Sequence, residues 1–181
     1  MVKKILALTI LCYLFNGCVS GQKLGDGTKV PEKGYKFKNK EKFNSEIYRT
    51  IDLNYFYELE YSYYSDLNFG EKGEAWPEKW VKILQFYPKG QVREYAHKFS
   101  NKDVNITGNR GIIYEKGNIL YIDMYGAISD GEMKILTFKL KIENNKIFMR
   151  ENSSFGGVSL CRVFNKSGKI PEDWKQYTAD W

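Results

Sequence analysis

Short aromatic and apolar segments, ended by turn-forming residues about every eight to twelve positions, run through most of this 181-residue chain. The clearest segment covers residues 55–63, where Tyr or Leu stands at every odd position, with Glu58 and Glu60 between them. A hydrophobic period of two predicts a β-strand with one buried face. We therefore expect the odd-numbered side chains of this segment to share the buried face.

The same pattern predicts about eight strands, most of them joined by short reversals such as Gly117-Asn118 and Asn144-Asn145. Short links favour antiparallel pairing of neighbours in the chain, so the sequence predicts an all-β fold, an antiparallel up-and-down meander. Eight strands suffice to close a small barrel and remove exposed sheet edges, so we expect a closed or partly open barrel. The expected strands span residues 55–63, 80–87, 91–99, 110–116, 119–127, 132–142, 147–151 and 158–165.

Helical signals are confined to two places. Residues 39–51 can form one or two turns before the first strand. Residues 171–174 place Pro and two acids where a helix begins, which predicts a short C-terminal helical turn. We expect residues 46–181 to form a single β domain, because no internal repeat divides them.

The start of the chain has the layout of an export signal. Lys3 and Lys4 precede an apolar run over residues 5–15, which is followed by Gly17-Cys18. A membrane-spanning helix needs about 20 apolar residues, so this run predicts a signal peptide over residues 1–17 that is cleaved.

Gly17-Cys18 resembles the lipobox of bacterial lipoproteins, whose cysteine receives diacylglycerol and becomes the new N-terminus. The resemblance implies lipidation of Cys18 and a membrane-anchored protein of the cell envelope. Val19 stands where inner-membrane lipoproteins of enterobacteria carry Asp, which favours the outer membrane. The alternative is an ordinary secretory signal cut after Ser20, which would leave a soluble protein.

The whole formal charge of +6 lies outside the predicted domain. Seven Lys and three acids fall in residues 19–45, whereas residues 46–181 carry 19 basic and 19 acidic side chains. A neutral body offers no electrostatic footprint for nucleic acid, so we expect no such partner. Residues 18–45 are rich in Lys and Gly, which predicts a flexible tether, either attracted to anionic headgroups or simply solvated.

The sequence argues against catalysis. Cys161 is the one thiol left after Cys12 leaves with the signal and Cys18 is lipidated, and its apolar neighbours predict a buried, inert side chain. His97 is the only histidine, too few for a zinc site, and no Gly-x-Ser-x-Gly elbow is present. We expect the acids of the strands, including Asp123, to face solvent. We therefore expect no enzyme activity, no metal and no cofactor.

The Lys-rich tether and the Tyr-rich meander, with turns over residues 86–90 and 114–118, resemble the small lipocalin-like lipoproteins of Bacteroidetes, most of which have no assigned function. The resemblance implies a lipocalin-like barrel. We expect the protein to be a monomer.

If the meander closes, its interior can hold a small apolar or sugar-like ligand. The alternative is a packed barrel that serves as a structural or protein-interaction module of the envelope. The candidate ligand-binding residues are Tyr57, Leu59, Tyr61, Trp80, Leu84 and Phe86.

Overall fold

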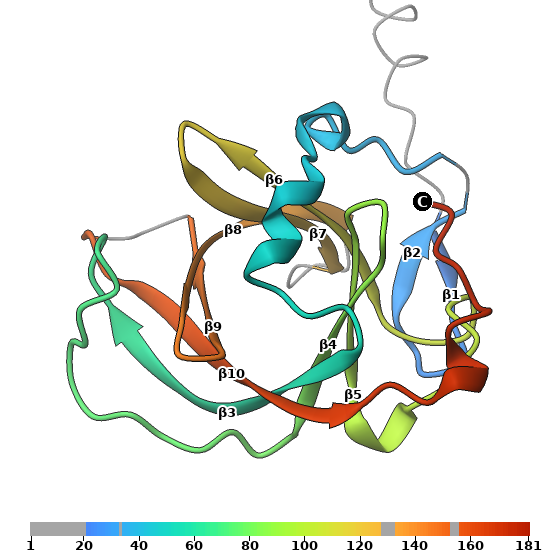
Figure 1. The fold of residues 1–181 in the computed structure, drawn as a ribbon. Coiled ribbons are helices and arrows are strands. Elements are labelled where there is room, and N and C mark those ends of the chain that lie inside the picture. Colours follow the sequence, from blue (N-terminus) through green and yellow to red (C-terminus); the bar gives the residue numbers. More distant parts are fainter. Residues whose placement is uncertain (1–20, 33, 128–132, 153–155) are drawn as a thin grey trace, which may run out of the picture.

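A computed structural model gives the structure of the chain and describes residues 21–32, 34–127, 133–152 and 156–181. Eight strands form a closed antiparallel barrel in which each strand pairs with its neighbours in the chain, and the last strand closes on the first (Figure 1). The predicted all-β meander is therefore confirmed, and the barrel is closed. Its strands are β3 (Tyr55–Ser65), β4 (Lys82–Phe86), β5 (Gln91–Ala96), β6 (Asn109–Lys116), β7 (Ile119–Ala127), β8 (Met133–Glu143), β9 (Lys146–Glu151) and β10 (Ser159–Lys169).

The helical signals also have counterparts. Two short 3-10 helices, η1 (Lys40–Lys42) and η2 (Ser45–Arg49), precede β3, and η4 (Glu172–Trp174) is the predicted C-terminal turn. A third, η3 (His97–Phe99), occupies the end of the segment predicted as the third strand.

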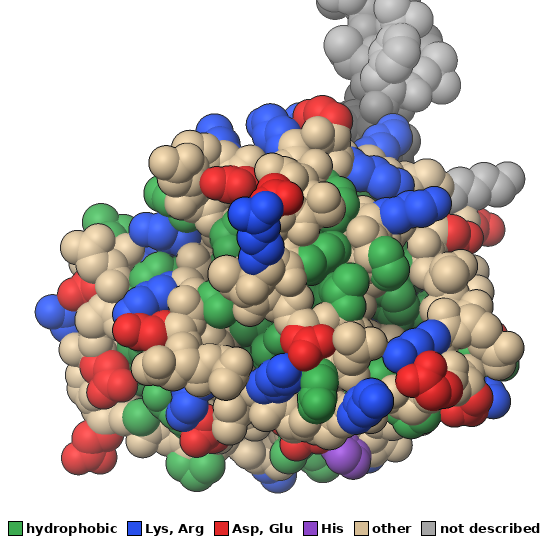
Figure 2. Space-filling view, viewed as in Figure 1, with side chains coloured by type: hydrophobic (Ala, Val, Ile, Leu, Met, Phe, Trp, Pro, Cys, Tyr) green, Lys and Arg blue, Asp and Glu red, His purple; other side chains and the backbone are tan. Residues whose placement is uncertain are grey.

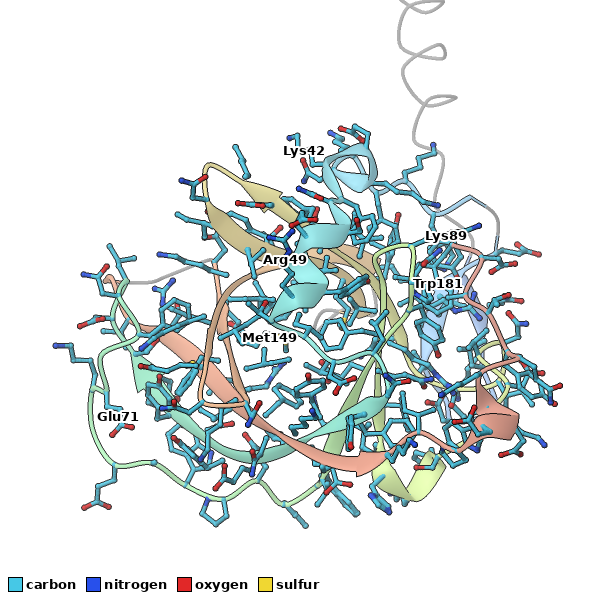
Figure 3. The ribbon with its side chains drawn as sticks, viewed as in Figure 1. Lys42, Arg49, Glu71, Lys89, Met149 and Trp181 are labelled. Atoms are coloured by element: carbon cyan, nitrogen blue, oxygen red, sulfur yellow. The ribbon has the colours of Figure 1, made fainter. Side chains whose placement is uncertain are left out.

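One end of the barrel is plugged by η2 and the residues after it. The Asn44 side chain caps η2 by accepting a hydrogen bond from the backbone N–H of Glu46 (3.1 Å). Ile47 and Ile51 are buried and pack into the cluster of apolar side chains that fills this half of the interior, where Met149 projects from β9 (Figure 3). We call this filled half the packed core.

A register shift on β3 divides its side chains between two clusters. Phe164 of β10 pairs with Leu59, but the preceding residue, Val163, pairs with Tyr61. Leu59 and Phe164 belong to the packed core, whereas Val163 joins a separate cluster with Tyr61 and Tyr63. The prediction that the odd residues of 55–63 share one face is wrong beyond Leu59, because one extra residue reverses the alternation.

Residues 21–32 and 34–45 pack against the outside of the barrel, whereas the sequence predicts a flexible tether over residues 18–45. They form a small sheet of β1 (Gly21–Lys23) and β2 (Lys29–Pro31), followed by a segment that buries Phe37. Phe37 and Tyr35 join a mostly aromatic cluster that also includes Trp181, whose indole N–H donates to the Gly111 carbonyl (2.8 Å). The alternating aromatic and Lys residues of this segment explain the difference, since rings are buried while Lys amines reach water.

This covering buries Asp123, which the sequence predicts at a solvent-facing position. Its carboxylate accepts hydrogen bonds from the hydroxyls of Tyr114 (3.1 Å) and Thr137 (2.6 Å) and from the Asn39 side-chain amide (2.9 Å). The solvent-facing prediction is wrong because Asn39 and its neighbours lie over this face of β7. Asp123 thereby fastens the N-terminal segment to the barrel.

We expect the substitution Asp123→Ala to lower the free energy of unfolding by about 2–4 kcal/mol, because it leaves buried donors without an acceptor. Urea denaturation followed by circular dichroism measures this loss. The control is Asp173→Ala, which removes an exposed ion pair with Lys102 and should cost less than about 1 kcal/mol. Equal losses in the two variants would contradict a fastening role for Asp123.

Candidate ligand-binding site

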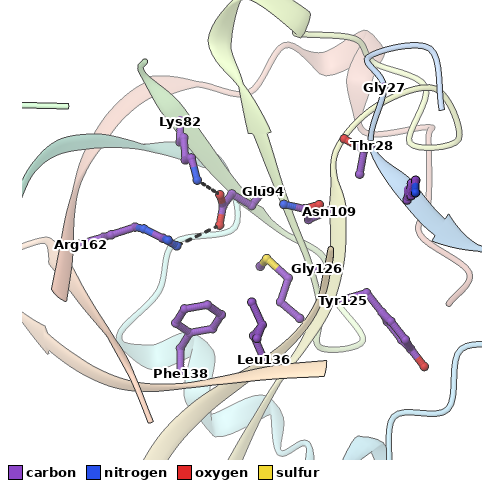
Figure 4. A pocket seen from close by; sticks show the side chains of 12 residues that line it. Gly27, Thr28, Lys82, Glu94, Asn109, Tyr125, Gly126, Leu136, Phe138 and Arg162 are labelled. Carbon is purple, nitrogen blue, oxygen red and sulfur yellow. Dashed lines mark ion pairs between the residues drawn. The ribbon is translucent and has the colours of Figure 1, made fainter. Parts of the chain in front are cut away.

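The half of the barrel interior away from η2 contains a cavity of about 410 Å³, shown in Figure 4. Alternation along the strands sends side chains from β4, β5, β6, β7, β8 and β10 toward it, and the turn between β1 and β2 supplies one wall. We call it the mouth cavity. It is lined by Gly27, Thr28, Lys29, Lys82, Glu94, Asn109, Met124, Tyr125, Gly126, Leu136, Phe138 and Arg162.

A buried carboxylate stands between two cations in the mouth cavity (Figure 4). Glu94 is 3% exposed, and its oxygens lie 2.8 Å from Lys82 Nζ and 3.8 Å from Arg162 Nη1. Burial raises the pKa of Glu94, but the charges of Lys82 and Arg162 outweigh it, so the pKa lies below the usual 4.5. Glu94 is therefore ionised at neutral pH.

The lowered pKa predicts how Glu94 contributes to stability. Because the unfolded chain binds this proton more readily than the folded one, the stabilisation is present above pH 4.5 and is lost as the pH falls through the folded pKa. We expect Glu94→Gln to be less stable than the wild type at pH 7, with the difference shrinking steadily below pH 4.5. Urea denaturation between pH 3 and pH 7 measures it. A difference independent of pH would show that the Glu94 charge does not carry the effect.

One side of the cavity wall is apolar. Met124 and Phe138 are almost fully buried, and Leu136 is 39% exposed. The Arg162 guanidinium lies over the Phe138 ring, 5.7 Å from its centroid, and so joins the charged and apolar parts of the wall.

Four of the six predicted ligand-binding residues lie in the packed core instead. Tyr57, Leu59, Leu84 and Phe86 are at most 6% exposed and pack among one another and the isoleucines of the plug. The Tyr57 hydroxyl accepts a hydrogen bond from the backbone N–H of Asp52 (2.8 Å). The phenol thus finds its partner in the plug.

The other two predicted residues lie elsewhere. Tyr61 packs in the cluster outside the barrel, beyond the register shift. Trp80 precedes β4 and is 53% exposed. The Lys98 ammonium lies over it, 4.0 Å from a ring centroid. The six residues therefore do not form one site.

Neither Cys161 nor His97 lines the mouth cavity. Burial raises the pKa of the Cys161 thiol to about 11, and the side chain packs beside Tyr63. The exposed His97 ring lies 3.7 Å from Glu58. Within the described ranges, no three His, Cys, Asp or Glu side chains are grouped so that they can hold a metal ion.

Cys18 lies outside the described residues, as does the predicted signal peptide. No helix in the part of the chain that is described has the length and apolar character to cross a bilayer. The visible face of the barrel intermixes basic and acidic side chains around an apolar hollow beside the plug (Figure 2).

Comparison with protein-family models, with curated proteins and with solved structures gives no match. The barrel assignment therefore rests on strand order and pairing alone.

Proposed function

We propose that this protein is a lipid-anchored binding protein of the bacterial cell envelope, and that its barrel holds a small ligand in the mouth cavity. The observation that carries the proposal is the division of the interior: apolar side chains fill the plugged half, whereas the other half keeps about 410 Å³. Ligand sites in proteins have volumes of about 300–1,000 Å³ with a mainly apolar wall and a few polar groups. The mouth cavity lies within that range of volume, and it combines apolar side chains (Met124, Phe138, Leu136) with a larger share of polar ones (Lys82, Glu94, Asn109, Arg162).

The finer assignment to lipocalin-like lipoproteins is part of the same proposal. It is supported by the eight-stranded meander barrel and by the lipobox-like Gly17-Cys18. We expect the lipid at Cys18 to hold the protein in the envelope, in the outer membrane rather than the inner one.

The ligand is tested by native mass spectrometry of the protein purified from its own host. The expected result is a population heavier than the lipidated polypeptide, which loses the extra mass on denaturation. A chain that carries no additional mass, together with an experimental structure in which side chains fill the mouth cavity, would contradict ligand binding.

The anchor is tested separately by metabolic labelling with an alkyne fatty acid. We expect the wild type to be labelled and Cys18→Ala to remain unlabelled. Equal labelling of both proteins would remove the anchor from the proposal without affecting the cavity.

The second candidate is a non-catalytic interaction module. It is favoured by exposed apolar side chains near η3. Trp80 (53% exposed) and Val81 (43%) line a surface depression there, and Phe99 (39%) shares with Trp80 a contact to the Lys98 ammonium. Single exposed apolar residues are common, but three together mark a contact surface. An unliganded native mass spectrum, combined with a complex that Trp80→Ala abolishes, would favour this candidate.

A further inference from the structure

The guanidinium of Arg162 is less well satisfied than its neighbours in the mouth cavity. It lies 3.8 Å from a Glu94 oxygen and 3.7 Å from a Glu151 oxygen, both beyond the usual length of a hydrogen bond. Among the described residues, no hydrogen bond from its five N–H donors is found. The Arg162 side chain is 17% exposed, so only part of it is in contact with water.

The Lys82 ammonium, by contrast, already has its anion. It lies 2.8 Å from Glu94, whose carboxylate is 4% exposed and thus scarcely reaches a ligand. The lining carries three cations, Lys29, Lys82 and Arg162, against the carboxylate of Glu94. The Glu151 carboxylate stands beside Arg162 outside the lining, which leaves one positive charge in excess. The charge that the cavity lacks is therefore negative, and Arg162 is placed to receive it.

The apolar side of the cavity wall favours a ligand whose remaining part is apolar. Arg162 stands over Phe138, and Met124 and Leu136 continue the wall beyond it. A planar guanidinium pairs with a carboxylate through two parallel hydrogen bonds. An aliphatic chain attached to such a carboxylate would lie on Phe138, Met124 and Leu136.

We propose that the mouth cavity selects small amphiphilic carboxylates, with the head group bound by Arg162 and the chain against the apolar wall. This inference rests on the proposed function, since it names the chemical class of the ligand for the same cavity. It also narrows that function, because it favours an apolar acid over a neutral sugar.

The test is equilibrium dialysis of the full chain in lipid nanodiscs, with empty nanodiscs subtracted, against three probes of equal chain length: octanoate, octanol and octylamine. We expect the wild type to bind octanoate at least about tenfold more tightly than octanol, because charge-assisted hydrogen bonds are added to the same apolar contact. Octylamine should bind more weakly than octanol, since it meets uncompensated positive charge.

Two variants assign the preference to Arg162. Arg162→Met should lose the preference for octanoate while its affinity for octanol stays within about twofold, and Arg162→Lys should keep part of it. The control is Arg49→Met, which removes an arginine at the plugged end, 78% exposed, and should bind all three probes like the wild type.

The outcomes separate the two proposals. If the wild type binds octanol and octanoate equally, or if Arg162→Met keeps the preference, the anion selectivity is overturned and the binding function stands. If the wild type binds none of the probes, both proposals fail for small amphiphiles. The comparison among probes on the wild type decides the point even if a variant does not fold.

Discussion

Phe164→Ala should lower the free energy of unfolding by about 3–5 kcal/mol, because it opens a cavity in the packed core. Phe164 is fully buried. In the sheet it pairs with Leu59 of β3 on one side and with Ile147 of β9 on the other. These residues adjoin the seam where the last strand closes on the first, so the surrounding backbone is held on both sides and cannot collapse into the space.

Urea denaturation followed by circular dichroism measures the effect. The matched control is Phe99→Ala, which removes the same side chain where it is 39% exposed and should cost less than about 1 kcal/mol. If Phe164→Ala costs no more than the control, the interior near the plug is not the tightly packed core described above.

Arg93→Met should have an effect of similar size, about 3–5 kcal/mol, although Arg93 lies outside the barrel interior. Its side chain is fully buried and donates to the backbone carbonyls of Thr107 (2.9 Å) and Asn101 (2.8 Å), as well as to the Thr107 hydroxyl. Met has a comparable length but no donor, so these carbonyls would lose their partner in a buried place. The loop over residues 101–107 should then detach from β5.

Two measurements check the Arg93 prediction: urea denaturation for the global loss, and amide hydrogen exchange for loop 101–107. Arg93→Lys should recover only part of the stability, because one ammonium cannot reach the acceptors that a guanidinium spans. A Met variant with wild-type stability and unchanged exchange in the loop would refute the account of this side chain.

The strands and their order could be predicted from the sequence because alternation and short turns act locally. The Gly117-Asn118 turn joins β6 to β7 as an antiparallel pair, and the Asn144-Asn145 turn joins β8 to β9 in the same way. Both asparagines of the second turn take positive φ, as such turns require. Eight strands suffice to close a small barrel, but their number alone does not distinguish a closed barrel from a partly open one.

The site could not be predicted in the same way, because alternation does not say which face of a strand is inside. Both faces of β5 are buried: Val92 and Glu94 face the interior, while Arg93 is covered by loop 101–107. The register shift after Leu59 was equally hidden, since Tyr suits either face. One signal was present, namely Arg162 within the apolar stretch 158–164, which marks a charge on a largely buried strand.

The covering of the barrel by residues 35–40 also escaped prediction, for an energetic reason. The segment contains Lys36, Lys38 and Lys40, which predict exposure to solvent. Phe37 between them is nevertheless buried against Tyr125, with the ring centroids 5.0 Å apart. Burying the aliphatic part of a lysine side chain at such a surface costs little free energy, because the amine remains in water. The aromatic partners that stabilise the segment are distant in sequence.

A ligand that occupies the mouth cavity should leave the packed core unchanged. Methionine reports on both places, because Met124 lines the mouth cavity and Met149 lies in the packed core. The most direct measurement is a methyl NMR titration of the full chain, labelled with ¹³C at the methionine methyl groups, with octanol. The Met124 signal should shift as octanol is added, until the site is saturated, while the Met149 signal stays in place. A Met149 signal that shifts as far as that of Met124, or a Met124 signal that does not respond to octanol or octanoate, would contradict ligand binding in the mouth cavity.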